Sequence, residues 1–185
     1  MTYYARKDRA LSEHIANTAN LAKGFAGVFG CEKTADLAGL LHDLGKYTHA
    51  FQVYLARSLM GEDVVRGEVI HALQGAKFAA ETIKDPVIAD IIGNVIATHH
   101  SGLFDSITDG ERTLYRRTDK NENELHYEEA IKEFSPSINE ARLKAEILNT
   151  CRAIQAKKLS LPFMLHLLTK AVYSCVVDAD RCDSA

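Results

Sequence analysis

Hydrophobic positions recur along most of the chain at the three- and four-residue spacing that places them on one face of an α-helix. These stripes predict helices over residues 11–25, 35–44, 49–59, 67–83, 86–99, 121–134, 137–158 and 161–181. Thr48 and Asp85 precede two of them as N-capping residues, and Pro86 suits a first helical position. The last stripe is apolar on nearly every side as far as Val177, which predicts a central helix. No strand-like alternation of useful length is present, so the predicted fold is all-α, a compact helical bundle.

The length of 185 residues suits a single domain over 1–185, with a variable polar connection at about 101–120. The hydrophobic share of 46% excludes a disordered or collagen-like chain. The N-terminus is too polar for a signal peptide, and charges break every apolar stretch before roughly 18 residues, so we expect no membrane-spanning helix. The four cysteines form no C-x-x-C pair, and we expect reduced, mostly buried thiols in a cytoplasmic protein.

The charge balance argues against a protein that grips nucleic acid by bulk electrostatics. Lys and Arg number 22 and Asp and Glu 25, so the formal net charge is −3. The most basic stretch, within residues 112–120, contains Arg116 and Arg117 beside Tyr115. Such a stretch can follow a nucleic-acid backbone with the aromatic ring stacked on a base, but it is more often a solvated loop. Any nucleic-acid substrate therefore depends on local patches such as this one, or on a partner.

Histidine is the residue type that carries the chemistry. Five of the eight histidines fall at helix ends or on apolar stripes: His14, His42, His71, His99 and His100. Asp43 follows His42, and Asp178 and Asp180 lie at the end of the last stripe. Imidazole binds transition metals, and a carboxylate can bridge two ions. Two such ions about 3.5–4 Å apart can activate water and stabilise both oxygens of a phosphoryl displacement.

Each of these residues also has a structural explanation when it is taken alone. A single histidine on an apolar face is usually a core residue, and Asp43 can simply orient a ring or pair with Lys46. Periodicity does not choose between Asp178 and Asp180, because both lie on apolar faces. If the five imidazoles converge, however, burying them without a metal ion would leave costly unpaired polar groups.

The order of these residues, H…HD…H…HH…D, resembles the HD phosphohydrolase superfamily. Three local segments sharpen the resemblance to the HD nuclease domain of the CRISPR-associated type I nuclease–helicase: residues 40–47 (LLHDLGKY), 70–76 (IHALQGA) and 97–103 (ATHHSGL). The resemblance covers roughly residues 10–183 and is weakest between about 105 and 160.

The resemblance implies a dinuclear metal site. One ion would be held by His14, His42, Asp43 and Asp180, and Asp43 would bridge to a second ion held by His71, His99 and His100. The family places its last ligand in an Ala-Asp pair, which favours Asp180 over Asp178. Catalytic roles would fall to Asp43, His42 and Lys46, the last near the scissile phosphate. Substrate would be bound by Lys46, Ser101, Arg116 and Arg117.

The function predicted on this resemblance is a metal-dependent nuclease that nicks and degrades single-stranded DNA in type I CRISPR interference. Its partners would be single-stranded DNA, a helicase domain in cis or in trans and the surveillance complex, with no membrane. The cofactors would be two divalent ions, Mn, Ni, Co or Fe rather than Mg, because imidazole is a poor ligand for Mg. Two alternatives stay open: a nucleotidase or cyclic-nucleotide phosphodiesterase, and a non-catalytic metal-binding signalling module.

Overall fold

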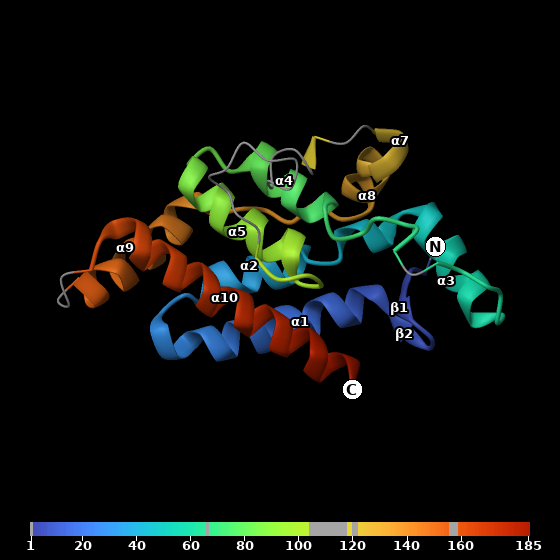
Figure 1. Cartoon of the computed structure of the whole chain (residues 1–185), viewed down its shortest axis with the longest axis horizontal. Coiled ribbons are helices and arrows are strands. Elements are labelled where there is room, and N and C mark those ends of the chain that lie inside the picture. The colour runs from blue at the N-terminus through green and yellow to red at the C-terminus, as the bar shows by residue number, and fades with distance from the viewer. Residues whose placement is uncertain (1, 66, 104–117, 120–121, 156–158) are drawn as a thin grey trace.

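The computed structural model describes residues 2–65, 67–103, 118–119, 122–155 and 159–185 (Figure 1). The predicted all-α fold is confirmed in this part of the chain. The helices are α1 (Leu11–Ala26), α2 (Glu32–Leu41), α3 (His49–Leu59), α4 (Gln74–Thr82), α5 (Pro86–Thr98), α7 (Glu122–Leu125), α8 (Tyr127–Glu133), α9 (Glu140–Gln155) and α10 (Leu161–Ser184). Two short 3-10 helices are η1 (Gly27–Phe29) and η2 (Leu44–Tyr47).

The capping residues named from the sequence begin their helices. The Thr48 side chain accepts a hydrogen bond from the Phe51 backbone N–H at 3.3 Å, which opens α3. The Asp85 side chain accepts from the backbone N–H of Val87, and Pro86 stands in the first turn of α5. Each cap satisfies a backbone donor that has no partner within its helix, which stabilises a helix by roughly 1 kcal/mol.

The core lies where α1, α2, α5 and α10 meet. In Figure 1, α10 runs beside α1, α5 packs against α10, and α4 lies against α5 on the side away from α1. Leu11, Leu41, Ile92, Ile96 and Val172 are completely buried at these contacts. Burying one such side chain is worth about 1.5–3 kcal/mol, so this apolar centre fixes how the helix ends meet.

Several predicted bounds were wrong, each for a local reason. Residues 67–73 form a loop rather than the first turns of a helix, and Gly67 there has a φ of 86°. The helix predicted over 121–134 is broken at His126, which has a φ of 49°. The helix predicted from 137 starts at Glu140, because the Asn139 side chain accepts from the Arg142 backbone N–H. The stripe over 35–44 leaves the α-helix at Leu41 and continues as η2.

A two-stranded antiparallel hairpin was missed altogether. It consists of β1 (Tyr4–Arg6) and β2 (Arg9–Ala10), and Asp8 in its turn has a φ of 57°. Strands of this length are too short to show alternation in the sequence. The hairpin leads directly into α1 and, through arginine side chains, reaches the end of α10.

Helix α10 is long and apolar enough to cross a membrane by length and composition alone, a test that the core helix of a soluble protein also passes. Here it packs against α1, α2, α5 and α9, as the central helix predicted from the sequence does. Its first turns are less central than predicted, since Leu161 and Phe163 are about half exposed, at 55% and 48%. Of the four thiols, Cys31, Cys151 and Cys175 are buried and free, and Cys182 is exposed.

Candidate metal centre

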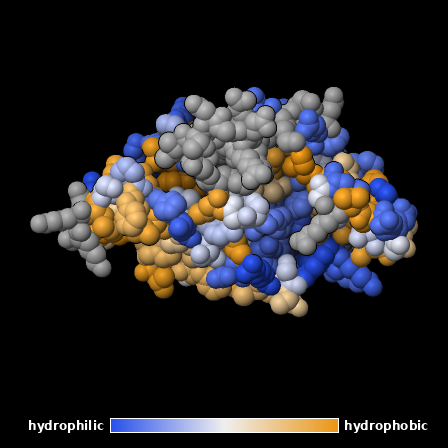
Figure 2. Space-filling model, viewed as in Figure 1, coloured by the Kyte–Doolittle hydropathy of each residue, from blue (hydrophilic) through white to orange (hydrophobic). Residues whose placement is uncertain are grey.

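Five elements bring the seven predicted ligands together. The contributing positions are His14 in α1, His42 and Asp43 directly after α2, His71 in the loop before α4, His99 and His100 directly after α5, and Asp180 in α10. The face of the molecule in Figure 2 carries a hydrophilic area at its centre, beside the C-terminal half of α10. Residues that are up to 166 positions apart thus meet on one side of the apolar core.

Two glycines allow the His42–Asp43 turn to lie close to the loop that carries His71 and to the start of α4. A β-carbon on Gly75, the second residue of α4, would meet the Leu41 carbonyl oxygen at 2.0 Å. A β-carbon on Gly45 would meet the side chain of Gln74 and the α-carbon of His71 within 2.5 Å. The Gly45 backbone N–H also donates to the His71 carbonyl at 3.2 Å. The close approach of these backbones fixes the His42–Asp43 turn beside the loop that carries His71.

His14, His42, Asp43 and Asp180 form a compact set, here called the inner group, whose ligand atoms lie within 4.8 Å of one another. The Nε2 atoms of His14 and His42 are 3.2 Å apart, and Asp43 Oδ2 lies 3.1 Å from the first and 3.2 Å from the second. Asp180 Oδ1 lies 3.4 Å from His14 Nε2 and 3.9 Å from His42 Nε2. Asp178, the alternative left open by periodicity, is exposed.

His71, His99 and His100 form the outer group, which shares Asp43 with the inner group. Ligand atoms of Asp43, His99 and His100 lie within 4.8 Å of one another. His71 joins them through His100, because the Nε2 atoms of these two rings are 3.0 Å apart. His99 is buried, His71 half-buried and His100 exposed, so the outer group is the side of the centre that faces solvent.

Hydrogen bonds on the far side of the inner rings identify which nitrogen carries the proton. His42 Nδ1 lies 2.7 Å from the Gly39 carbonyl oxygen, and His14 Nδ1 lies 2.8 Å from a carboxylate oxygen of Asp183. Both partners only accept, so each Nδ1 carries hydrogen and each neutral ring presents a lone pair at Nε2. Two lone pairs and a carboxylate oxygen of Asp43 therefore face one another at about 3 Å. When both rings are neutral, Lys46 Nζ donates to Asp43 Oδ2 at 2.6 Å, and a metal ion would satisfy the remaining lone pairs.

The outer group shows the same arrangement. His99 Nδ1 lies 2.6 Å from the Ile96 carbonyl oxygen, so its Nε2 is again an acceptor. That Nε2 atom and Asp43 Oδ1 are 3.7 Å apart, and both are buried without a hydrogen-bond partner among the described residues. Buried acceptors without partners are costly, and a shared metal ion would satisfy them. The donor set of imidazoles and carboxylates thus fits divalent transition metals.

The pKa of His14 in the inner group is raised, whereas the pKa values of His71 and His100 in the outer group are lowered. Burial lowers the pKa of His14, but hydrogen bonds to Asp43 and Asp183 outweigh it and raise that pKa above the ordinary value. Burial alone would raise the pKa of Asp43, yet Lys46 and His42 hold it well below its usual range. Desolvation lowers the pKa of His71 to about 4. Desolvation and neighbouring His99 also lower the pKa of His100, although part of this residue is exposed.

The other predicted site residues lie at or outside the edge of this centre. Lys46 is close: its Nζ lies 2.6 Å from Asp43 Oδ2, and its side chain is 13% exposed. Ser101 is exposed and lines a cavity beside the outer group. Arg116 and Arg117 lie outside the described residues, as does most of the connection predicted at 101–120.

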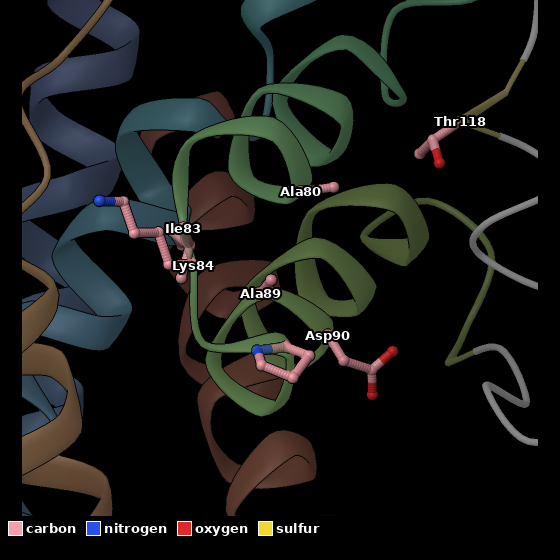
Figure 3. A pocket seen from close by; sticks show the side chains of 7 residues that line it. Ala80, Ile83, Lys84, Ala89, Asp90 and Thr118 are labelled. Atoms are coloured by element: carbon pink, nitrogen blue, oxygen red, sulfur yellow. The ribbon is translucent and has the colours of Figure 1, made fainter.

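Two cavities differ in their relation to the metal ligands. One of about 500 Å³ lies against the outer group, and its described lining is mostly apolar: Gly67, Val69, Ile70, His71, Ala72, Leu73, Ala97, His100 and Ser101. The other, of about 190 Å³, lies between the end of α4 and the start of α5 (Figure 3). Its charged residues Lys84 and Asp90 point away from each other in that view, and none of the seven predicted ligands lines it. Only the first cavity adjoins the candidate metal centre.

The sequence reasoning missed Asp183, which lies three residues after Asp180 on α10. Its carboxylate accepts from His14 Nδ1, and its side chain is only 5% exposed. The spacing of three residues was the available signal, because positions i and i+3 share a helix face.

An all-α fold in which helix ends gather imidazoles and carboxylates around a shared aspartate has the donor set of a metal-binding protein. The family model of the HD domain matches residues 11–134, and the chain belongs to this family. HD domains are typically metal-dependent phosphohydrolases and typically soluble. The match includes every candidate ligand except Asp180. A comparison with curated proteins found no match for the chain.

Proposed function

We propose that the chain is a metal-dependent phosphodiesterase that cleaves single-stranded DNA, with the inner and outer groups each holding one divalent ion. One observation carries the metal-dependent chemistry: ligand atoms of His14, His42, Asp43 and Asp180 lie within 4.8 Å of one another, and the Nε2 lone pairs of the neutral rings face the carboxylate of Asp43 at about 3 Å. Bound ions would supply an activated water molecule and neutralise charge that develops on the phosphate.

The residues of the chain divide this work. In the proposal, Asp43 spans both groups, since its Oδ2 faces His14 and His42 while its Oδ1 faces His99. Backbone carbonyls of Gly39 and Ile96 fix the rings of His42 and His99, so these ligands need little rearrangement. Lys46 places a positive charge at the margin of the centre, where it can attract a phosphate.

The assignment to DNA and to type I CRISPR interference is supported by the sequence contexts of the HD pair, of His71 and of the His99–His100 doublet. In this proposal a helicase domain, in cis or in trans, and the surveillance complex deliver displaced single-stranded DNA. Delivery by partners agrees with a net charge of −3, which gives little bulk attraction for nucleic acid. The predominance of imidazole favours Mn, Ni, Co or Fe over Mg.

A nucleotide phosphohydrolase is the second candidate, and the cavity of about 500 Å³ beside His71 and His100 favours it. Its volume suits a single nucleotide, and its described lining is mostly apolar and contains no lysine or arginine. A polymer substrate would be better served by basic walls.

The test is a cleavage assay with Mn²⁺ on single-stranded DNA, free nucleotides and cyclic dinucleotides in parallel. The proposal expects cleavage of the DNA that disappears in Asp43→Ala, with a circular dichroism spectrum like that of the wild type. Cleavage of a nucleotide alone would select the second candidate. No metal-dependent cleavage of any substrate by a metal-loaded protein would indicate a non-catalytic module, and equal activity of Asp43→Ala would contradict the proposed centre.

A further inference from the structure

Four candidate ligand rings have a hydrogen-bond acceptor at Nδ1, but one acceptor differs from the others. The Nδ1 atoms of His42, His71 and His99 face backbone carbonyl oxygens, at 2.7, 3.3 and 2.6 Å. His14 instead faces a carboxylate oxygen of Asp183, at 2.8 Å. A backbone carbonyl orients an imidazole, whereas a carboxylate also makes its opposite nitrogen a stronger ligand.

Asp183 is held in a built environment, unlike an acidic residue on an open surface. Its Oδ2 meets His14, while its Oδ1 accepts from Asn17 Nδ2 at 3.0 Å and from a guanidinium nitrogen of Arg9. Arg6 donates to the backbone carbonyls of Asp183 and Ser184. The β1–β2 hairpin therefore ties the end of α10 to α1 at the point where His14 enters the centre.

The same contacts distinguish Asp183 from a direct ligand. Both of its carboxylate oxygens already have partners, and its contact with His14 is on the ring nitrogen that points away from Asp43. Asp180, one helical turn earlier, presents its oxygen to the Nε2 side instead. The two aspartates thus lie on opposite sides of one imidazole ring.

We propose that the charged carboxylate of Asp183 is a positioning residue: it fixes the ring of His14 with hydrogen on Nδ1 and strengthens Nε2 as a ligand for a divalent ion in the inner group. This inference rests on the proposed metal function. Asp183 and Arg9 lie outside the matched HD segment of residues 11–134, whereas His14 and Asn17 lie inside it. Loss of a hydrogen-bonding partner of this kind typically weakens metal binding roughly 10–100-fold.

The experiment measures Co²⁺ affinity by calorimetric titration and follows ligand-field absorption. Both are performed in the full chain carrying His71→Ala, which weakens the outer group so that the remaining site reports on the inner one. Asp183→Ala and Asp183→Asn are added to this background. Asp178→Ala is the matched control, because it removes an exposed carboxylate from the same helix. Thermal unfolding of each metal-free protein shows whether the fold is retained.

The proposal expects Asp183→Ala to weaken Co²⁺ binding roughly 10–100-fold, with a smaller loss in Asp183→Asn, which keeps an acceptor but not the charge. Asp178→Ala should bind Co²⁺ like its parent. If Asp183→Ala fails to fold, Asp183→Asn decides. Parent-like affinity in the folded variant would overturn the positioning role and leave the proposed function standing. Failure of the unmodified chain to bind Co²⁺ would overturn both.

Discussion

The inner and outer groups use the same kind of side chain in different surroundings. The inner rings of His14 and His42 are buried between α1, α2 and α10, and the pKa of His14 is raised by the carboxylates around it. In the outer group His71 and His100 lie at the solvent side beside a large cavity, and desolvation and neighbouring rings lower their pKa values.

This contrast indicates a division of labour across one centre. The inner group offers a cation two carboxylates, Asp43 and Asp180, and places it between helices of the core. The outer group offers three imidazoles and the shared Asp43, so it gives a cation less compensating charge, and its solvent side leaves room for a ligand. We therefore expect the inner ion to bind more tightly, and the outer ion to be the one that meets substrate. Asp43 joins the two, so changes there affect both.

Replacing the shared residue should have the largest effect. Asp43→Asn keeps the shape of the side chain but removes the charge that faces both groups, so metal affinity should fall at both. Because metal ions contribute several kcal/mol to such reactions, phosphodiester cleavage should fall by about 10³-fold or more. Initial rates with Mn²⁺ measure this, with Asp178→Asn as the matched control. A loss at one group only would break the idea that Asp43 is shared.

Removing an outer ligand should separate the groups. His71→Ala should reduce bound metal from two ions to one and slow cleavage by roughly 10²-fold, because one ion and its Lewis acidity are lost. His49→Ala, an exposed histidine outside both groups, is the control. Elemental analysis after Mn²⁺ loading and gel filtration gives the stoichiometry. Loss of both ions in His71→Ala would contradict the independence of the inner group.

The close contact between Gly75 of α4 and the Leu41 carbonyl of α2 should be sensitive to a single added methyl group. Gly75→Ala would place a β-carbon 2.0 Å from the Leu41 carbonyl oxygen, so α4 must shift away from α2. We expect a loss of about 1–3 kcal/mol in the free energy of unfolding, measured by urea denaturation. Gly24→Ala, an exposed helical position with no atom within 4 Å, should instead be neutral or stabilising. An equal change in the free energy of unfolding for both variants would show that α4 and α2 are less closely packed at Gly75 than described.

Acidity should affect the inner group first. The raised pKa of His14 means that the metal-free protein gains stability from its protonated ring below about 6.5 and loses this gain as pH rises through the higher folded pKa. Metal binding has the opposite sign, since His14 must release its proton. Mn²⁺ affinity should therefore fall roughly 10-fold per pH unit below the folded pKa. Titrations at several pH values in His71→Ala measure this, and a pH-independent affinity would contradict it.

The sequence predicts the fold and the order of ligands better than their surroundings. Helical stripes and the caps Thr48 and Asp85 are local signals, and they predict most helices correctly. The gathering of His14, His71 and the other ligands depends on contacts between distant segments, which only the family resemblance could suggest. The role of Asp183 was not predicted, because its partners lie on α1 and on a hairpin too short to leave a pattern. The same limit applies to the loop at 67–73, whose tertiary contacts override the helical stripe.

The most direct test of the central claim is the number of divalent ions per chain in the purified protein after loading with Mn²⁺ and removal of free metal. Elemental analysis should give about two ions for the unmodified chain and close to none for Asp43→Asn, with both proteins folded. A folded, unmodified chain that retains no divalent ion at neutral pH would contradict the account.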